Sequence, residues 1–283
     1  MATLSCSLQW DGSQPYGFDR VLVTHVRANM KYSNSGYNKK GISYLDDAYA
    51  KFGDLLQDQG YTKEAEILQI KVLDTRNEIL GVEHPETIRA MGNLAITYYY
   101  LGKYTVAEKM ELEVLIANSR SLGVDNPETI DAMANLAGTY RKLGKYTEAE
   151  KLEMQVLDAS KRILGVEHPD TINAMGHLAA TYRKLGKYTE AEKLEIQVLD
   201  ASNRVLGVEH PDTINGMANL ATTYQKLGKY MEAKKLEMQV LDAVRVPCQL
   251  SFHSHYQPLL FLLYLLKSLQ VTFFLLQVVF VFT

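Results

Sequence analysis

Residues 168–209 read HPDTINAMGHLAATYRKLGKYTEAEKLEIQVLDASNRVLGVE, and closely similar stretches recur along this chain of 283 residues. A proline, a glycine and an alanine of this stretch each return every 42 residues. The positions are Pro85, Pro127, Pro169 and Pro211; Gly102, Gly144, Gly186 and Gly228; Ala107, Ala149, Ala191 and Ala233. A fixed period of this length is typical of an architecture built from stacked repeats.

One repeat, residues 127–168, predicts two helices. Pro127 suits a first helical turn, and the preceding Asn126 can cap the free backbone N–H groups there. Apolar residues then follow at steps of three and four, and Gly144 is suited to end the first helix. The second helix is marked in the same way by Ala149, Leu152, Val156, Ala159 and Ile163. Neither helix alone can bury its apolar face, so the helix pairs are expected to stack.

The stretch Leu136-Ala137-x-x-Tyr140, with Gly144, Ala149 and Pro169 after it, resembles a tetratricopeptide repeat. The repeat length and the His-Pro-Asp-Thr junction resemble the kinesin light chain type, and similar arrays occur in fungal and bacterial nucleotide-binding signalling ATPases. The resemblance covers residues 44–243. It implies an all-α fold, a right-handed superhelical solenoid of about five helix-turn-helix repeats.

Two columns of the repeat depart from the family pattern. Glutamate replaces the usual aromatic residue of the second helix at Glu111, Glu153, Glu195 and Glu237. Valine replaces a usually small residue one turn later at Val114, Val156, Val198 and Val240. We expect the larger valines to compensate for the lost core volume.

The repeats divide the chain into three parts. Residues 1–43 do not follow the repeat and are interpreted as an irregular leader or, alternatively, as the end of a preceding domain. The array is expected to follow as repeats 44–84, 85–126, 127–168, 169–210 and 211–243. The first repeat is degenerate, as terminal repeats often are. The pattern stops after Ala243, and Pro247 is expected to end the last helix.

The remaining residues 244–283 are mostly apolar, and three interpretations of them stay open. Residues 258–283 are long enough to span a bilayer, although Lys267 would cost about 2.5–3.5 kcal/mol at its centre. The tail could instead cover the apolar end of the last repeat. The abrupt loss of the repeat also fits an aberrant terminus of the gene product.

Composition excludes several classes of function. The net charge of −3 argues against general nucleic-acid binding. The two cysteines, Cys6 and Cys248, form neither a disulfide framework nor a zinc motif, so a reducing, cytoplasmic setting is expected. His84, His168 and His210 lie a repeat apart and are interpreted as residues that begin helices. We therefore expect no catalytic, metal or cofactor-binding residues.

Candidate binding residues follow from the resemblance, which implies that the first helix of each repeat lines a concave groove. The positions are Asn93, Asn135, His177 and Asn219; Tyr99, Arg141, Arg183 and Gln225; and Lys142, Lys184 and Lys226. Amides can bond a peptide backbone, and the cations can pair with carboxylates. One hypothesis is a groove for an acidic peptide segment or a C-terminal carboxylate. The alternative is a solvated face, balanced by glutamates such as Glu153.

These patterns favour a non-enzymatic scaffold for protein–protein interaction that binds a peptide of a partner, similar to a kinesin light chain adaptor. One alternative is the detached sensor arm of a nucleotide-binding signalling ATPase. Another is a tail-anchored membrane adaptor that uses residues 258–283. The heptad segment that would join a kinesin light chain to kinesin heavy chain is not seen, which argues against that partner.

Overall fold

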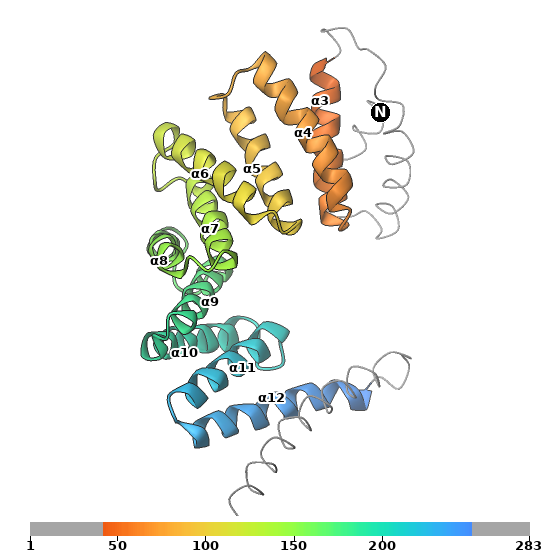
Figure 1. Ribbon diagram of the computed structural model, residues 1–283. Helices are drawn as coiled ribbons and strands as arrows, with labels where there is room; N and C mark the ends of the chain where they lie inside the picture. Colours follow the sequence, from red (N-terminus) through yellow and green to blue (C-terminus); the bar gives the residue numbers. More distant parts are fainter. Residues whose placement is uncertain (1–41, 251–283) are drawn as a thin grey trace, which may run out of the picture. The chain divides into compact units, whose positions relative to one another are not determined.

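The computed structural model describes residues 42–250, and these residues form ten α-helices and no β-strand (Figure 1). The helices alternate between a first helix of 16 or 17 residues and a second helix of 18 or 21 residues. Their bounds are α3 Ile42–Asp58, α4 Thr62–Ile79, α5 Pro85–Tyr100, α6 Tyr104–Ser121, α7 Pro127–Lys142, α8 Tyr146–Ile163, α9 Pro169–Lys184, α10 Tyr188–Val205, α11 Pro211–Lys226 and α12 Tyr230–Leu250.

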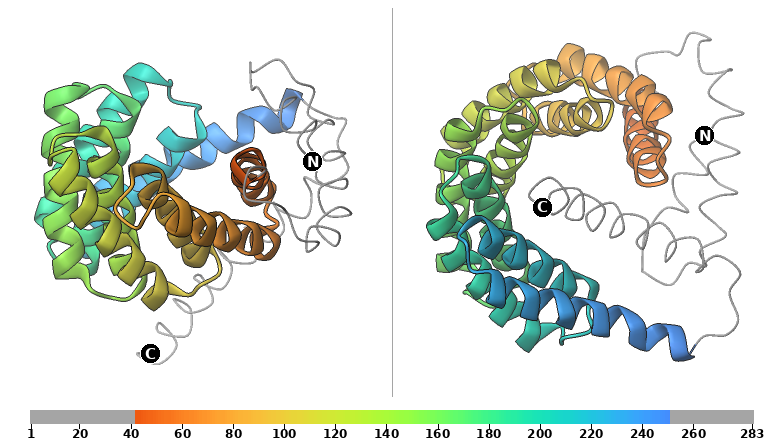
Figure 2. Two further views of the ribbon diagram at one scale, coloured as in Figure 1. Left: turned by 90° about the horizontal axis from the view of Figure 1, so that it is seen from above. Right: turned by 60° about the horizontal axis from the view of Figure 1, so that its bottom comes forward.

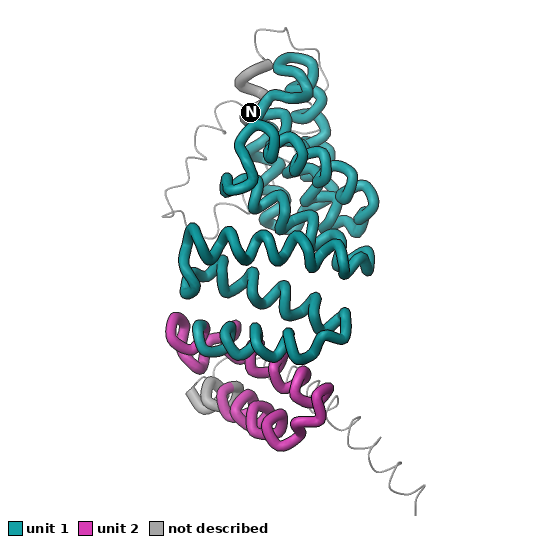
Figure 3. The backbone as a smooth tube through the Cα atoms, turned by 90° about the vertical axis from the view of Figure 1, so that its left-hand side faces the viewer, with its two compact units in different colours: residues 1–201 teal, residues 202–283 magenta. Residues whose placement is uncertain are grey.

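The chain divides into two compact units at residue 201 (Figure 3). The first unit contains α3 to α9 and most of α10, and the second contains α11 and α12. Within the first unit each helix packs against its neighbours along the chain. There, α5, α7 and α9 lie on the inner side of an arc, with α6 and α8 on the outer side (Figure 2).

Helices α7 and α8 begin and end where the sequence predicts. Asn126 Oδ1 accepts the Glu128 N–H at 2.9 Å, and His168 Nδ1 accepts the Asp170 N–H at 3.2 Å. These contacts satisfy N–H groups that have no partner inside the helix. The interpretation of the recurring histidines as helix-start residues is thus confirmed. The turns after α7 and α8 place Gly144 and Gly165 at φ +76° and +89°, where glycine is favoured.

The core runs through the hairpins rather than around one centre. One cluster joins Val156 and Leu157 of α8 to Ile172 and Met175 of α9. Three valines of the column that departs from the family pattern are buried, namely Val114, Val156 and Val240. These three valines therefore pack in the core, and their compensation for the lost aromatic volume stays a prediction.

Ion pairs tie successive hairpins together at their turns. Lys103 Nζ lies 2.7 Å from Glu66 Oε1, Lys145 repeats this contact with Glu108 at 2.5 Å, and Lys187 with Glu150 at 2.7 Å. Each lysine reaches the second helix of the preceding hairpin, and it also stands over a tyrosine ring of its own hairpin. Exposed ion pairs add little to stability, so we expect these contacts mainly to align successive hairpins.

The expected fold class, an all-α solenoid of about five helix-turn-helix repeats, is confirmed. One local prediction is wrong: α12 continues to Leu250, three residues beyond Pro247. A proline removes only one helical hydrogen bond at its own position, so a helix with many others can continue past it. The leader and the apolar segment 258–283 lie outside the described residues. Among residues 42–250 no helix is both long and apolar enough to cross a membrane.

Candidate functional site

A polar contact links the two helices of the hairpins just below the inner face. Arg183 Nε of α9 lies 3.2 Å from Glu195 Oε1 of α10, and Arg141 makes the same contact with Glu153. Both glutamates are buried. In these two hairpins, the glutamate that replaces the family's aromatic residue faces an arginine. The positive charge of the arginine balances the carboxylate, which burial would otherwise leave unpaired.

The same two positions hold different pairs in the other hairpins. Gln57 and Gln69 form a neutral pair, with an Nε2 to Oε1 distance of 3.1 Å. In the last hairpin, Gln225 donates to Glu237 at 2.6 Å. The second hairpin differs from all of these, because Tyr99 stands where the arginine would be and Glu111 has no cation of its own hairpin facing it.

In the first three hairpins a threonine of the next hairpin lies beside the residue of the second helix. The Thr97 hydroxyl donates to Gln57 Oε1 at 2.6 Å and lies 2.5 Å from Gln69 Oε1. Burial raises the pKa of Glu111 to about 6, and the neighbouring Thr139 hydroxyl opposes this shift only in part. Burial also raises the pKa of Glu153, which Thr181 and Arg141 oppose.

Two predicted groove residues meet on the inner face between α7 and α9. Arg141 Nη1 lies 3.2 Å from His177 Nδ1. Partial desolvation and the nearby Arg141 lower the pKa of His177, which favours the neutral ring, and Nδ1 of the neutral ring can accept the guanidinium N–H. Both residues border a small pocket, open to solvent, which is lined by Ala134, Arg141, Glu153, Val156, Ala174 and His177.

Two further predicted groove residues, Tyr99 of α5 and Lys142 of α7, contact each other. Lys142 Nζ stands 5.9 Å from the centre of the Tyr99 ring, within range of a cation–π contact. The Tyr99 ring also packs edge-on against Tyr100 and Tyr104. An aromatic cluster thus lies beside the exposed Lys142, which directly follows Arg141 in the chain.

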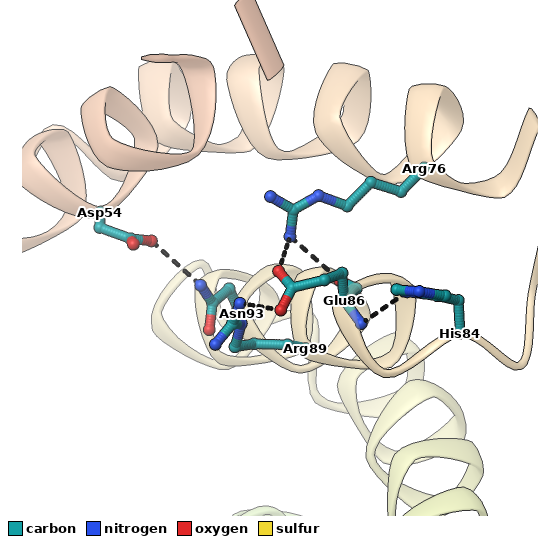
Figure 4. A network of polar contacts seen from close by, with 6 residues as sticks. All are labelled: Asp54, Arg76, His84, Glu86, Arg89 and Asn93. Atoms are coloured by element: carbon teal, nitrogen blue, oxygen red, sulfur yellow. Dashed lines mark hydrogen bonds and ion pairs between the residues drawn. The ribbon is translucent and has the colours of Figure 1, made fainter. Parts of the chain in front are cut away.

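Asn93 belongs to a network at the first hairpin junction (Figure 4). It donates to Asp54 Oδ1 of α3 at 3.1 Å, and burial together with Asp58 raises the pKa of Asp54. In the same network Arg76 of α4 lies 3.3 Å from Glu86 of α5. Asn93 is thus already engaged within the fold.

The other predicted residues are distributed as follows. Asn135 and Lys184 are exposed on the first unit. Asn219, Gln225 and Lys226 lie on α11 of the second unit and are also exposed. Glu153 does balance the charge of Arg141, as the alternative interpretation expected, but its carboxylate is buried rather than solvated. Within the first unit, Arg141 and Arg183 face buried glutamates, whereas Lys142 and Lys184 are exposed.

Sequence reasoning missed the arginine–glutamate pairs, although a signal was present. The two positions lie 12 residues apart, and two successive hairpins carry opposite charges at this spacing, as Arg141 with Glu153 and Arg183 with Glu195. Among the described residues no group of three or more histidine, cysteine, aspartate or glutamate side chains could hold a metal ion.

Comparison with known proteins agrees with this architecture. A family model described as tetratricopeptide repeat matches residues 44–115, 128–201 and 170–245. A search among curated proteins found no match.

Several solved structures are similar to the chain. A kinesin light chain-like protein of nearly identical TPR-like repeats from Podosopora anserina is 27% identical, with a TM-score of 0.65 over 72% of this chain and 96% of that one. BtubC (BKLC) from P. vanneervenii is 16% identical, with a TM-score of 0.64 over 84% and 91% of the two chains. A Rap protein solved in complex with competence and sporulation factor is 12% identical, with a TM-score of 0.58 over 80% and 59%. The last two show the fold alone.

Proposed function

Because the chain belongs to the tetratricopeptide repeat family, we propose that it is a non-enzymatic scaffold that binds an extended segment of a partner protein. The binding surface is the inner face of α5, α7 and α9. The likeness to a kinesin light chain-like protein supports an adaptor role in particular.

The contact between Arg141 and His177 carries this proposal. It joins side chains of two successive first helices, so that a ligand lying across the helices would meet both residues at once. Ala134 and Ala174 in the adjoining pocket are small enough for a peptide backbone to come close. Polar groups around a shallow, partly apolar pocket suit the recognition of a peptide.

The charges of this face favour an acidic segment. The Arg141 Nε atom faces Glu153, but the guanidinium has further N–H donors that point toward the pocket side at His177. Lys142 and Lys184 are exposed at the ends of α7 and α9, and neither is engaged by a buried carboxylate. A ligand carboxylate beside these lysines would form charge-assisted hydrogen bonds.

A peptide-display selection against the full chain tests the proposal. The bound peptides are expected to be rich in aspartate and glutamate. Their affinity should fall by about tenfold or more in a Lys142→Glu, Lys184→Glu variant, because like charges then face each other. A Lys151→Glu, Lys193→Glu variant is the matched control. It makes the same change of charge at exposed positions of the second helices α8 and α10.

Three outcomes count against parts of the proposal. Equal loss in both variants would mean that net charge alone drives binding. Peptides without acidic residues would leave the scaffold role standing and remove the acidic preference. Failure to select any peptide above background would overturn the groove as a binding site.

A further inference from the structure

Helix α12 exposes a face that the earlier second helices bury against the next hairpin. On α8 this face consists of Glu150, Glu153 and Leu157. Glu150 pairs with Lys187, Glu153 lies near Thr181, and Leu157 belongs to the core cluster shared with α9. The equivalent residues of α12 are Lys234, Glu237 and Leu241, together with Tyr230 one turn earlier.

The exposure of these residues shows how much of the face is uncovered. Leu157 is 7% exposed and Glu153 is 4% exposed, whereas Leu241 is 42% exposed and Tyr230 is 70% exposed. Lys234 and Glu237 are exposed as well. Ala233 and Val240, on the other side of the helix, are buried. A stripe with large apolar residues at both ends and charges between them is therefore open to solvent.

One residue of the stripe breaks the pattern of the repeat. The four earlier second helices carry glutamate at this position, as Glu66, Glu108, Glu150 and Glu192, but α12 carries Lys234. The first three of these glutamates each bind the turn lysine of the next hairpin. A further hairpin of the same kind would place its lysine against Lys234, and like charges repel. The stripe is thus unsuited to another repeat of this type.

The stripe does match itself. Consider two copies of α12 that pack antiparallel, with a twofold axis passing between Lys235 and Leu236. Lys234 then lies opposite Glu237 of the partner subunit, and Tyr230 lies opposite Leu241 of the partner subunit. Because the axis repeats each contact, the interface contains two ion pairs flanked by two apolar contacts. Self-complementary contacts of this kind are what a twofold interface requires.

We propose that the chain forms a homodimer through antiparallel packing of the α12 stripe, defined by Tyr230, Lys234, Glu237 and Leu241. This surface is separate from the inner face of α5, α7 and α9, so the dimer would present two peptide-binding faces. Pairing through a single helix buries less area than a standard interface, and the dimer is therefore expected to dissociate on dilution.

Sedimentation equilibrium of the full chain tests the dimer, over roughly 1 µM to 1 mM, the range in which small interfaces dissociate. The wild type is expected to shift from monomer to dimer. Lys234→Glu should remain monomeric, because it sets two carboxylates against each other. The double variant Lys234→Glu, Glu237→Lys should dimerise again, since it exchanges the charges and restores both pairs. Lys235→Glu, which alters the neighbouring exposed lysine, should dimerise like the wild type.

Several results would overturn the dimer. One is a wild type that stays monomeric over the whole range. Another is association that Lys234→Glu leaves unchanged, since a different surface would then be responsible. A third is a double variant that shows the helical circular dichroism of the wild type and yet stays monomeric.

Discussion

Arg183 Nε lies 3.2 Å from Oε1 of the buried Glu195, and the hairpin before it repeats this contact between Arg141 and Glu153 at the same distance. The pair joins opposite charges from the two helices of one hairpin. Its glutamate occupies the position where the family usually has an aromatic residue. Buried ion pairs add little net stability, but they are costly to break. Several measurable consequences follow from this arrangement.

Replacing Arg183 with leucine should destabilise the array. The buried Glu195 would lose the opposite charge of Arg183. We expect a loss of about 2–4 kcal/mol in the free energy of unfolding, below the upper range for broken buried pairs because the Arg183 side chain is 22% exposed. The midpoint of urea unfolding, followed by circular dichroism, measures this loss. The double variant Arg183→Gln, Glu195→Gln copies the natural pair Gln57 and Gln69 and should recover most of it. A double variant as unstable as the single one would contradict the role of the pair.

Replacing Glu111 with glutamine should stabilise the protein at neutral pH. The folded-state pKa of Glu111 is about 6, above its ordinary value of 4.5, so the folded protein binds the proton more tightly than the unfolded chain. This tighter proton binding adds to the free energy of unfolding. The contribution is fully present below pH 4.5 and is lost as the pH rises through 6. At pH 7.5 the ionised carboxylate therefore costs about 2 kcal/mol, which Glu111→Gln should recover.

Urea unfolding of the wild type and Glu111→Gln at pH 5 and pH 7.5 measures this effect. The two proteins should differ less at pH 5 than at pH 7.5. Glu113→Gln, which removes a carboxylate at an exposed position of the same helix, is the control for net charge. A difference between wild type and Glu111→Gln that does not change with pH would refute the assigned titration.

Replacing His168 with alanine should weaken the start of α9. The side chain accepts the Asp170 N–H, and the loss of such a cap costs about 1 kcal/mol. His168→Asn should be nearly neutral, because Asn126 makes the same contact at the start of α7. Thermal unfolding distinguishes the two, and equal melting temperatures for the alanine and asparagine variants would speak against the cap.

Two glycines should respond in opposite ways to replacement with alanine. Gly165 has φ +89°, which costs a residue with a Cβ atom about 1 kcal/mol or more. Gly138 lies inside α7, where an added Cβ would come no closer than 3.9 Å to Arg141. Alanine there should add about 0.5–1 kcal/mol of stability. Urea unfolding measures both, and stabilisation by Gly165→Ala would be the contrary result.

Much of the fold could be predicted because its signals are local. Pro127, Asn126 and Gly144 mark helix ends through backbone chemistry that needs no knowledge of the partner helix. The burial of Val156 followed from the helical period. The environment of Glu153 could not be predicted in this way. A carboxylate at the border of an apolar face can be either buried or exposed to solvent, and the position of the neighbouring helix decides which.

The contacts of the candidate site were harder to predict for the same reason. Arg141 and Lys142 are adjacent cations in the sequence, but only the fold shows that one faces a buried glutamate while the other stands over Tyr99. The ring of Tyr99 comes from the preceding hairpin, 43 positions away. Contacts between hairpins depend on how the helices cross, and the repeat pattern does not contain that information.

The turn lysines have a genetic consequence. The same lysine–glutamate ion pair joins successive hairpins at each of these junctions. In each case the lysine contacts a glutamate 37 residues earlier, as seen for Lys103, Lys145 and Lys187. Unequal crossing-over between neighbouring copies would insert or delete whole hairpins and still leave each lysine with its glutamate. The array can therefore change in length over evolution without passing through a misfolded intermediate, and the reach of its binding surface can change with it.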